Sequence, residues 1–195
     1  ANSTVFGAIA GDEMAAAIGR GVPLRDPDLE FVEQAIVRAE KPFGQTKADL
    51  SELRERLWSV MWDKVGILRT ADGIREGLRG LDDCRETLTG IGVENDDRAF
   101  NLTWHDWLNL DNQITVSQAI AGASLARDDS RGAHFREDFP MTGNLEQSTY
   151  TFTRYENGQL IQEMAPVAFT MVKPGESLID GEAGAPRAAQ NGDPS

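Results

Sequence analysis

Basic and acidic side chains gather in one short stretch of the sequence, which reads Asp129-Ser130-Arg131-Gly132-Ala133-His134-Phe135-Arg136-Glu137-Asp138-Phe139-Pro140. Arginine binds carboxylates through paired hydrogen bonds, so Arg131 and Arg136 could clamp an anionic substrate. The same side chains could instead form a salt-bridged turn that fixes the end of a preceding helix. Because these basic and acidic groups can neutralise one another locally, we expect a structural role for Arg131, His134 and Arg136. The substrate clamp is the alternative.

The other histidine, His105, stands next to Asp106, which could orient it as a general base. Adjacent residues on a helix point about 100° apart, however, so this pair does not face itself. His134 has no cluster of further ligands that would indicate a metal site, and the chain has a single cysteine, Cys84. Glycine-rich phosphate-binding motifs are absent from the sequence. We therefore predict no catalytic residue and no metal ligand in this chain.

The sequence opens on Ala1-Asn2-Ser3-Thr4 and passes directly into small and apolar residues that read as a helix to about Ile18. Asn2 or Ser3 is expected to cap this helix. Its small residues would let it pack very closely on a backbone or a flat ligand. A helix that starts so abruptly, with no strand or loop before it, indicates a chain cut from a longer protein.

The elements that must position these residues are mainly helical. A short helix is expected over 28–41, ended by Pro42, and longer helices over 47–68, from Thr70 or Asp72, and from about Asp97. Their predicted buried faces consist of Leu50, Leu53, Leu57, Val60, Met61, Lys64, Val65 and Leu68, then Ile74, Leu78, Leu81, Leu88 and Ile91, then Phe100, Leu102, Trp104, Trp107, Leu108, Ile114, Val116, Ala119, Ile120 and Leu125. Short connections favour antiparallel neighbours, so the three longer helices predict a bundle.

After Pro140 the pattern changes to strands. Residues 150–155 alternate, Asn157-Gly158 indicates a hairpin turn, and 160–164 and 167–172 are predicted as further strands, with Pro166 marking a break or an edge. The last stretch, 181–195, is expected to be a disordered tail. The predicted divisions are therefore 1–45 (first helix and linker), 46–140 (three-helix bundle), 141–180 (small β unit) and 181–195 (tail).

Composition narrows the function. The 195 residues include 32 Asp and Glu against 19 Lys and Arg, a net charge of −13, which argues against nucleic acid as a partner. No apolar run approaches the roughly 20 residues of a membrane helix, so direct membrane insertion is not expected. With a single cysteine, a reducing, cytoplasmic location is expected.

The stretch Ser130–Pro140 resembles the Ser-Arg-Gly-Ala-His-x-Arg-Glu-Asp-Tyr/Phe-Pro motif of the succinate dehydrogenase and fumarate reductase flavoprotein subunits and of the related L-aspartate oxidase. The order of parts is also similar: a helical bundle, this stretch, then a strand unit opened by Ser148-Thr149-Tyr150-Thr151. The opening residues look like the end of the family's Arg-Leu-Gly-Ser-Asn-Ser-Leu segment. Thr4 departs from the usual Leu there, and Ala1 from the usual Ser or Gly.

This resemblance implies the C-terminal part of an FAD-dependent oxidoreductase, mainly α, with a flavin-edge helix, a three-helix bundle and a small C-terminal β appendage. It implies that 1–45 closes the FAD-binding domain and that Ser3 and Thr4 bind the cofactor FAD. The glycine-rich dinucleotide motif, the capping domain and a substrate-binding arginine three positions before Ala1 would lie upstream. The whole protein would transfer a hydride between FAD and a dicarboxylate.

The resemblance also implies partners. The chain would pack on the remaining FAD-binding and capping domains and could present a face to an iron–sulfur subunit, which would associate it with a membrane. An L-aspartate oxidase-type flavoprotein, which needs no such subunit, is one alternative. A non-catalytic scaffold or docking module for an iron–sulfur subunit, without flavin contact, is the other.

Overall fold

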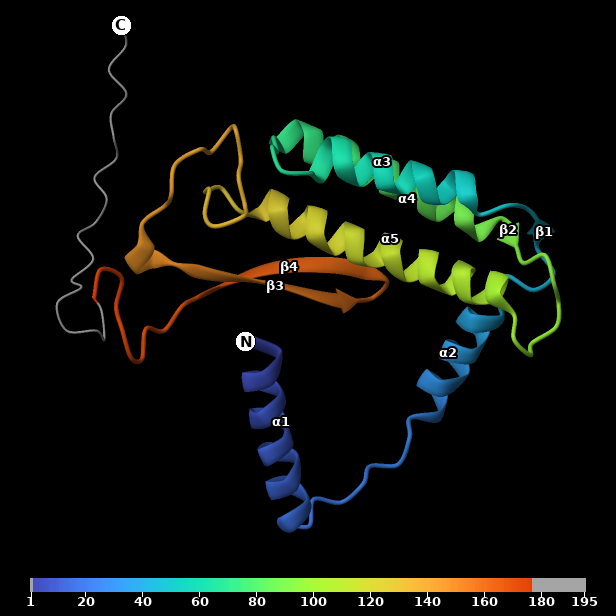
Figure 1. The fold of residues 1–195 in the computed structure, drawn as a ribbon, viewed down its shortest axis with the longest axis horizontal. Helices are drawn as coiled ribbons and strands as arrows, with labels where there is room; N and C mark the ends of the chain where they lie inside the picture. The colour runs from blue at the N-terminus through green and yellow to red at the C-terminus, as the bar shows by residue number, and fades with distance from the viewer. Residues whose placement is uncertain (1, 177–195) are drawn as a thin grey trace, which may run out of the picture. The chain divides into compact units, whose positions relative to one another are not determined.

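The computed structural model describes residues 2–176 and divides the chain into two compact units, Ala1–Lys41 and Pro42–Ser195 (Figure 1). The first unit holds α1 (Asn2–Gly19) and α2 (Leu29–Glu40). Asp28 begins α2 as predicted, because its carboxylate accepts hydrogen bonds from the backbone N–H groups of Glu30 and Phe31 at 3.1 and 3.2 Å. The predicted tail, 181–195, lies outside the described residues.

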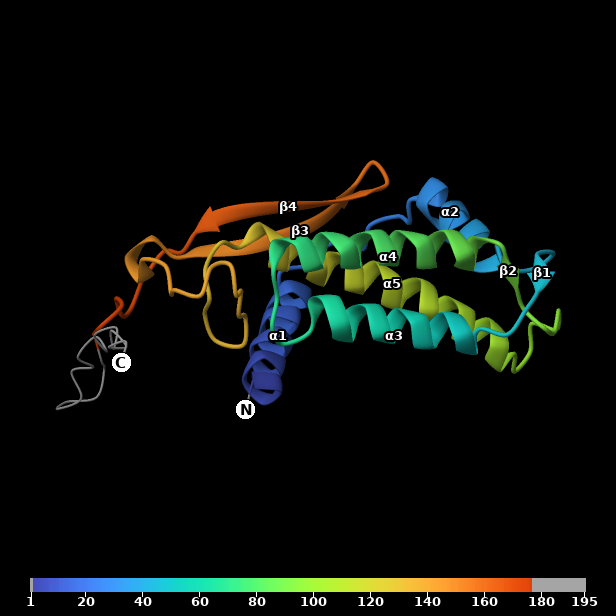
Figure 2. The same ribbon diagram turned by 90° about the horizontal axis from the view of Figure 1, so that it is seen from above.

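The second unit is built on three helices, α3 (Ser51–Val65), α4 (Ala71–Thr89) and α5 (Leu102–Ala126), which run in alternating directions (Figures 1 and 2). The predicted three-helix bundle is confirmed. Two short parallel strands, β1 (Thr46–Lys47) and β2 (Ile91–Gly92), pair at one end of it. The core consists of Leu50, Leu53, Leu57, Val65, Ile74, Leu81, Cys84, Leu88, Val93, Trp107, Leu110, Ile114 and Ala121.

Helix α3 is shorter than the predicted 47–68. It ends at Val65 because the backbone of Gly66 turns so tightly that a Cβ there would stand 2.3 Å from the carbonyl oxygen of Trp62. Leu68, predicted on the buried face, is 63% exposed beyond the helix. The predicted start of the following helix at Thr70 is confirmed, since the Thr70 hydroxyl accepts from the backbone N–H of Gly73 at 3.1 Å and caps α4.

Helix α5 begins at Leu102, and the predicted start near Asp97 is wrong. Asn101 explains the difference, because its side chain makes two sets of hydrogen bonds. Its amide donates to the carbonyl oxygens of Asn95 and Asp97, at 2.6 and 2.7 Å, and holds them in a loop. Its side-chain oxygen accepts from the backbone N–H of Trp104 at 2.9 Å and so caps the helix.

Four residues predicted on the buried face of the third helix are exposed instead: Phe100, Leu102, Val116 and Ile120. Phe100 lies in the loop before α5, and Leu102 is the first residue of that helix. Val116 and Ile120 lie well inside the helix, on a side that α3 and α4 leave uncovered.

The hairpin is β3 (Thr149–Glu156) paired antiparallel with β4 (Gln159–Pro166), preceded by the 3₁₀ turn η1 (Leu145–Gln147). Asn157 and Gly158 have φ of 51° and 82°, as a two-residue turn of this kind requires. The predicted strand over 167–172 is wrong. Pro166 pairs with Thr149, the first residue of β3, and the N–H of Val167 donates to the carbonyl oxygen of Ser148 at 2.8 Å; before Ser148 the chain turns into η1, so the pairing ends there. The hairpin lies along α5 (Figure 2).

Candidate functional site

Arg136 lies at the centre of the stretch that the sequence singled out. Its side chain is 1% exposed. One terminal nitrogen of its guanidinium donates to the carbonyl oxygens of Ser124, Leu125 and Arg127, at 3.1, 3.3 and 2.9 Å. Ser124 and Leu125 lie in the last turn of α5 and Arg127 directly follows it. The last carbonyls of a helix have no partner within it, so the positive charge of Arg136 caps the negative end of α5.

The rest of the Arg136 guanidinium forms a two-pronged ion pair with Asp138. Nε and the second terminal nitrogen each lie 2.7 Å from a carboxylate oxygen. Asp138 also accepts from the backbone N–H of Ala71 at 2.9 Å, in the first turn of α4. The guanidinium and this N–H hold the pKa of Asp138 well below its usual range, and the carboxylate raises the pKa of Arg136. This pair therefore joins the end of α5 to the start of α4.

Two residues shape the backbone that carries this pair. Ser130 is buried, and its hydroxyl accepts from the backbone N–H of Arg136 at 2.9 Å while donating to the carbonyl of Phe139 at 2.7 Å. Gly132 has a φ of 58°, a conformation that favours glycine. It lets Arg131 and His134 exchange backbone hydrogen bonds of 2.8 and 3.0 Å across a tight turn.

His134 connects the turn to the end of α3 through Arg69. Arg69 donates from Nε to the carbonyl of Val65 at 3.0 Å, and its terminal nitrogen lies 3.2 Å from Nδ1 of His134. A guanidinium only donates, so Nδ1 must accept, which makes the ring neutral with its hydrogen on Nε2. Burial, and then the positive charges of Arg69 and Arg127, lower the pKa of His134 and favour this neutral form.

Arg127 and Arg131 connect the same turn to the hairpin. Arg127 pairs with Asp129 and donates to the carbonyl oxygen of Thr149, both at 3.2 Å. Arg131 donates to the hydroxyl of Ser148 at 2.9 Å. The stretch thus joins the ends of α3 and α5, the start of α4 and the start of β3.

The predicted structural role is confirmed in the contacts of Arg136, which are with an acid and with helix-end carbonyls. A substrate could not reach its buried guanidinium. Sequence reasoning missed Arg69, which no motif marks. It also missed the ion pair between Arg85 on α4 and Asp111 on α5; an acidic residue on the buried face of an apolar helix was the available signal.

The other candidates do not belong to this turn. His105 is exposed, and Asp106 lies 3.1 Å from Arg54, so the two do not form a base and its orienting acid. Ser3 and Thr4 lie exposed in the first turn of α1, in the other unit. Helix α1 already includes Asn2 and Ser3, so the expected start, with one of them as the cap, lies too late in the sequence.

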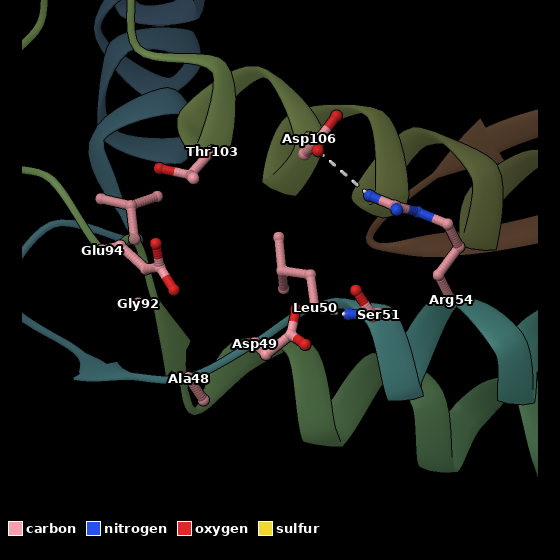
Figure 3. A pocket seen from close by; sticks show the side chains of 10 residues that line it. Ala48, Asp49, Leu50, Ser51, Arg54, Gly92, Glu94, Thr103 and Asp106 are labelled. Atoms are coloured by element: carbon pink, nitrogen blue, oxygen red, sulfur yellow. Dashed lines mark hydrogen bonds and ion pairs between the residues drawn. The ribbon is translucent and has the colours of Figure 1, made fainter.

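A small polar hollow of about 140 Å³ lies at the opposite end of the bundle, where α3 and α5 begin (Figure 3). Asp49 faces it and accepts from the backbone N–H of Ser51 at 3.0 Å, while Arg54 is held by Asp106. The Asp49 carboxylate thus binds the first turn of α3, and the pair of Arg54 and Asp106 joins α3 to α5. Among residues 2–176, no cluster of three or more His, Cys, Asp or Glu could hold a metal ion.

Residues 35–178 match the family model described as the fumarate reductase flavoprotein C-term. The chain belongs to this family. The matched residues contain the whole bundle, the turn and the hairpin. No described helix is long and apolar enough to cross a membrane.

Several curated relatives of this flavoprotein family are similar in sequence. An uncharacterized FAD-dependent oxidoreductase of Methanocaldococcus jannaschii is 31% identical over 144 residues, 73% of this chain and 25% of the relative. The fumarate reductase flavoprotein subunit of Haemophilus influenzae is 29% identical over 71% of this chain and 23% of its own length. The 8-methylmenaquinol:fumarate reductase flavoprotein subunit of Wolinella succinogenes is 29% identical over 88% and 29%. This chain thus spans about a quarter of the length of such relatives.

Solved structures are similar as well. The Mycobacterium smegmatis Sdh1 complex with UQ1 contains a chain that is 29% identical, with a TM-score of 0.68 over 78% of this chain and 26% of that one. Escherichia coli quinol fumarate reductase matches with a TM-score of 0.69 over 80% of this chain and 28% of that one, at 20% identity, and adenylylsulfate reductase of Archaeoglobus fulgidus with 0.69 over 82% and 28%, at 16% identity. The last two likenesses concern the fold alone.

Proposed function

We propose that this chain is the C-terminal part of an FAD-dependent oxidoreductase of the succinate dehydrogenase and fumarate reductase type. The whole protein would transfer a hydride between FAD and a carbon–carbon bond flanked by carboxylates. The observation that carries this proposal is the family match over 35–178, which includes the complete turn around Arg136. The similarity to an FAD-dependent oxidoreductase and to a fumarate reductase flavoprotein subunit supports FAD as the cofactor and a dicarboxylate as the substrate.

Within this function, the first turn of α1 would contribute to the FAD site. Ser3 and Thr4 are exposed there, and the first backbone N–H groups of an α-helix have no partner within it. Such a helix end carries a partial positive charge, which suits the negative charge that FAD gains at its N1/O2 edge on reduction. Ser3 and Thr4 would hold that edge through their hydroxyls and backbone.

The remaining roles of this chain would be supportive. Its basic turn is occupied by Asp129, Asp138 and helix carbonyls, so the residues that bind and protonate the dicarboxylate would come from the FAD-binding and capping domains. An iron–sulfur subunit would take the electrons onward. The complex would then lie on the cytoplasmic side of a membrane, held there by partner subunits.

The test uses the full-length flavoprotein that contains this chain. Purified protein should show flavin absorbance, oxidise succinate with an artificial dye and reduce fumarate with a reduced dye. Oxidation of L-aspartate without succinate oxidation would replace the proposal with the aspartate oxidase type. Full-length protein that binds no FAD would overturn it.

The contribution of α1 is tested by replacing Ser3 and Thr4 together with Ala in the same protein. Flavin retention should fall, whereas the matched change Thr87→Ala, at an exposed site on α4, should leave it unchanged. Equal retention in both variants would remove Ser3 and Thr4 from the cofactor site and leave the family function standing.

A further inference from the structure

The imidazole of His134 lies in the turn around Arg136, and neither of its ring nitrogens faces an acceptor. A terminal guanidinium nitrogen of Arg69 lies 3.2 Å from Nδ1, and a guanidinium can only donate. Nε2 is buried from solvent and has no hydrogen-bond partner among the described residues. The turn therefore accommodates the neutral ring, with Nδ1 accepting and the single hydrogen on Nε2.

A protonated imidazole needs an acceptor at each nitrogen, because both nitrogens then carry a hydrogen. In the closed turn the hydrogen on Nδ1 would point at the guanidinium of Arg69, and the hydrogen on Nε2 would stay without a partner. Burying a charge without hydrogen-bond partners is costly. The geometry of the closed turn thus opposes the charged form of His134.

Charged groups of two elements add to this effect. Burial lowers the pKa of His134 first, and three cations lower it further: Arg69 beyond α3, and Arg127 and Arg136 in the turn itself. Asp129 acts in the opposite sense, but its carboxylate already pairs with Arg127 at 3.2 Å and with Arg131 at 3.5 Å. The start of α4 and the hairpin meet the turn through uncharged groups, the backbone N–H of Ala71 and the hydroxyl of Ser148.

Residues 131–134 form the tip of the turn, and Gly132 and Ala133 at its end are exposed. Backbone hydrogen bonds of 2.8 and 3.0 Å between Arg131 and His134 close this tip. Arg136 lies outside it and is held separately, by Asp138 and by carbonyl oxygens at the end of α5. The tip can therefore open without breaking the connection between α4 and α5.

We propose that His134 makes this tip an acid-sensitive switch: when the ring takes up a proton, residues 131–134 open, the imidazole leaves Arg69 and enters solvent, and the bundle stays folded. Opening removes the side-chain link between the turn and the end of α3, whereas Arg136 and Asp138 still join α5 to α4. An imidazole in solvent is charged below about pH 6.5, so the switch operates from that pH downward. It does not depend on the proposed function, because every group in it belongs to this chain.

Amide hydrogen exchange followed by NMR on the 195-residue chain tests this switch. After correction for the intrinsic pH dependence of exchange, the backbone N–H groups of Arg131 and His134 should lose about five- to tenfold in protection between about pH 7.5 and pH 5.5, because the open tip binds one proton more. A local opening exposes little surface, so low concentrations of urea should not change exchange at the tip. Exchange at Leu81 in the core of α4 should accelerate in urea instead. Tip protection that is equal at both pH values would overturn the proposal, as would a urea response at the tip equal to that of Leu81.

Two variants assign the effect to the ring and to its neighbour. His134→Gln can still accept from Arg69 but does not titrate, so tip protection should be the same at both pH values. Arg69→Gln offers an amide oxygen to the protonated ring, so the loss of protection at low pH should shrink to about twofold or less. The matched control is His105→Gln, at the exposed second histidine on α5, which should keep the full loss. A full loss in His134→Gln, or in Arg69→Gln, would show that the contact between these two residues does not control the tip.

Discussion

At the scale of single residues, Arg136 shows why a cluster of charges can be structural. A buried guanidinium is costly unless every N–H has an acceptor and the charge has a partner. Here Asp138 takes one side and the end of α5 the other, so the residue most suited to bind a carboxylate substrate already holds a carboxylate of its own chain.

Arg136→Lys keeps the charge but cannot reproduce this arrangement, because an ammonium lacks the planar fork. We expect it to lower the free energy of unfolding by at least about 2 kcal/mol, since hydrogen bonds to charged groups contribute about 1.5–3 kcal/mol each. Urea unfolding of the 195-residue chain measures the change. The control is Arg75→Lys on α4, an exposed pair with Asp72 that should shift stability by less than about 0.5 kcal/mol. Equal effects of the two changes would contradict the capping role.

The lowered pKa of His134 predicts that the stability of the folded chain depends on pH. Its folded pKa lies below the ordinary 6.5, so protons bind the unfolded chain more readily than the folded one. The stability of the native state should therefore fall as pH drops below about 6.5, and it should level off above that pH. Protonation would add a charge next to Arg69, Arg127 and Arg136, and the charge of Asp129 offsets this in part.

The measurement compares the unfolding free energy of the chain and of His134→Gln between about pH 8 and pH 5.5. Gln can still accept from Arg69 but does not titrate, so its profile should be flatter over this range. Asp138 does not interfere, because an acid whose pKa is lowered by folding loses its stabilising contribution only below about pH 5, where the unfolded chain begins to take up the proton. Parallel profiles would show that His134 does not couple to folding.

At the scale of elements, sequence rules succeeded at the starts of α2 and α4 and at the hairpin turn, where a local signal decided the structure. The sequence predicts a helix start at Asp28 and another at Thr70 or Asp72, and the structure has Asp28 and Thr70 as the caps; Asn157-Gly158 is a hairpin turn as predicted. These rules failed where a side chain acted over a distance. The periodicity does not reveal that Asn101 binds two carbonyls of the preceding loop, so that α5 begins later than predicted. Nor does it reveal that the strand pairing of β4 ends at Pro166.

The helix faces were predicted well in α4 and α3 and less well in α5, for a physical reason. Burial patterns identify a face only when the opposite side is polar. The outer side of α4 is charged, whereas α5 is neutral on both sides, so Val116 and Ile120 looked like core residues. The candidate turn was found from its residue types, but the links it makes to Arg69 and Ala71 depend on the tertiary fold.

Leu57 allows a test of the buried core of the bundle. It is 1% exposed and lies on α3 within the cluster shared by all three helices. Leu57→Ala should lower the free energy of unfolding by about 2–5 kcal/mol, through lost burial and the cavity left behind. Tryptophan fluorescence during denaturation reports it. The control Leu68→Ala, at an exposed position after α3, should change stability by less than about 0.5 kcal/mol. A small effect at Leu57 would mean that the face of α3 is misassigned.

At the scale of the whole molecule, the two units differ in the stability expected of each one by itself. The unit that begins at Pro42 has its own core, Thr70 and Asn101 cap the starts of α4 and α5, and the turn around Arg136 closes one end of it. The unit Ala1–Lys41 consists of two helices, and α2 has no buried residue. Independent stability is therefore expected for the bundle and not for the segment that carries Ser3 and Thr4.

The 195-residue chain by itself should therefore fold cooperatively yet hold little or no flavin and have no succinate-oxidising activity. Ser3 and Thr4 could contact only one edge of the ring, and they stand on a helix that lacks a core of its own; the glycine-rich dinucleotide motif is absent from the sequence. Contacts to a single edge cannot offset the entropy lost when a cofactor is immobilised. Circular dichroism should show a helical protein with one unfolding transition, and the visible spectrum after incubation with FAD and gel filtration should be nearly flat. Retained stoichiometric FAD or robust dye-linked succinate oxidation would show that this chain holds a complete cofactor site, contrary to the role assigned to it.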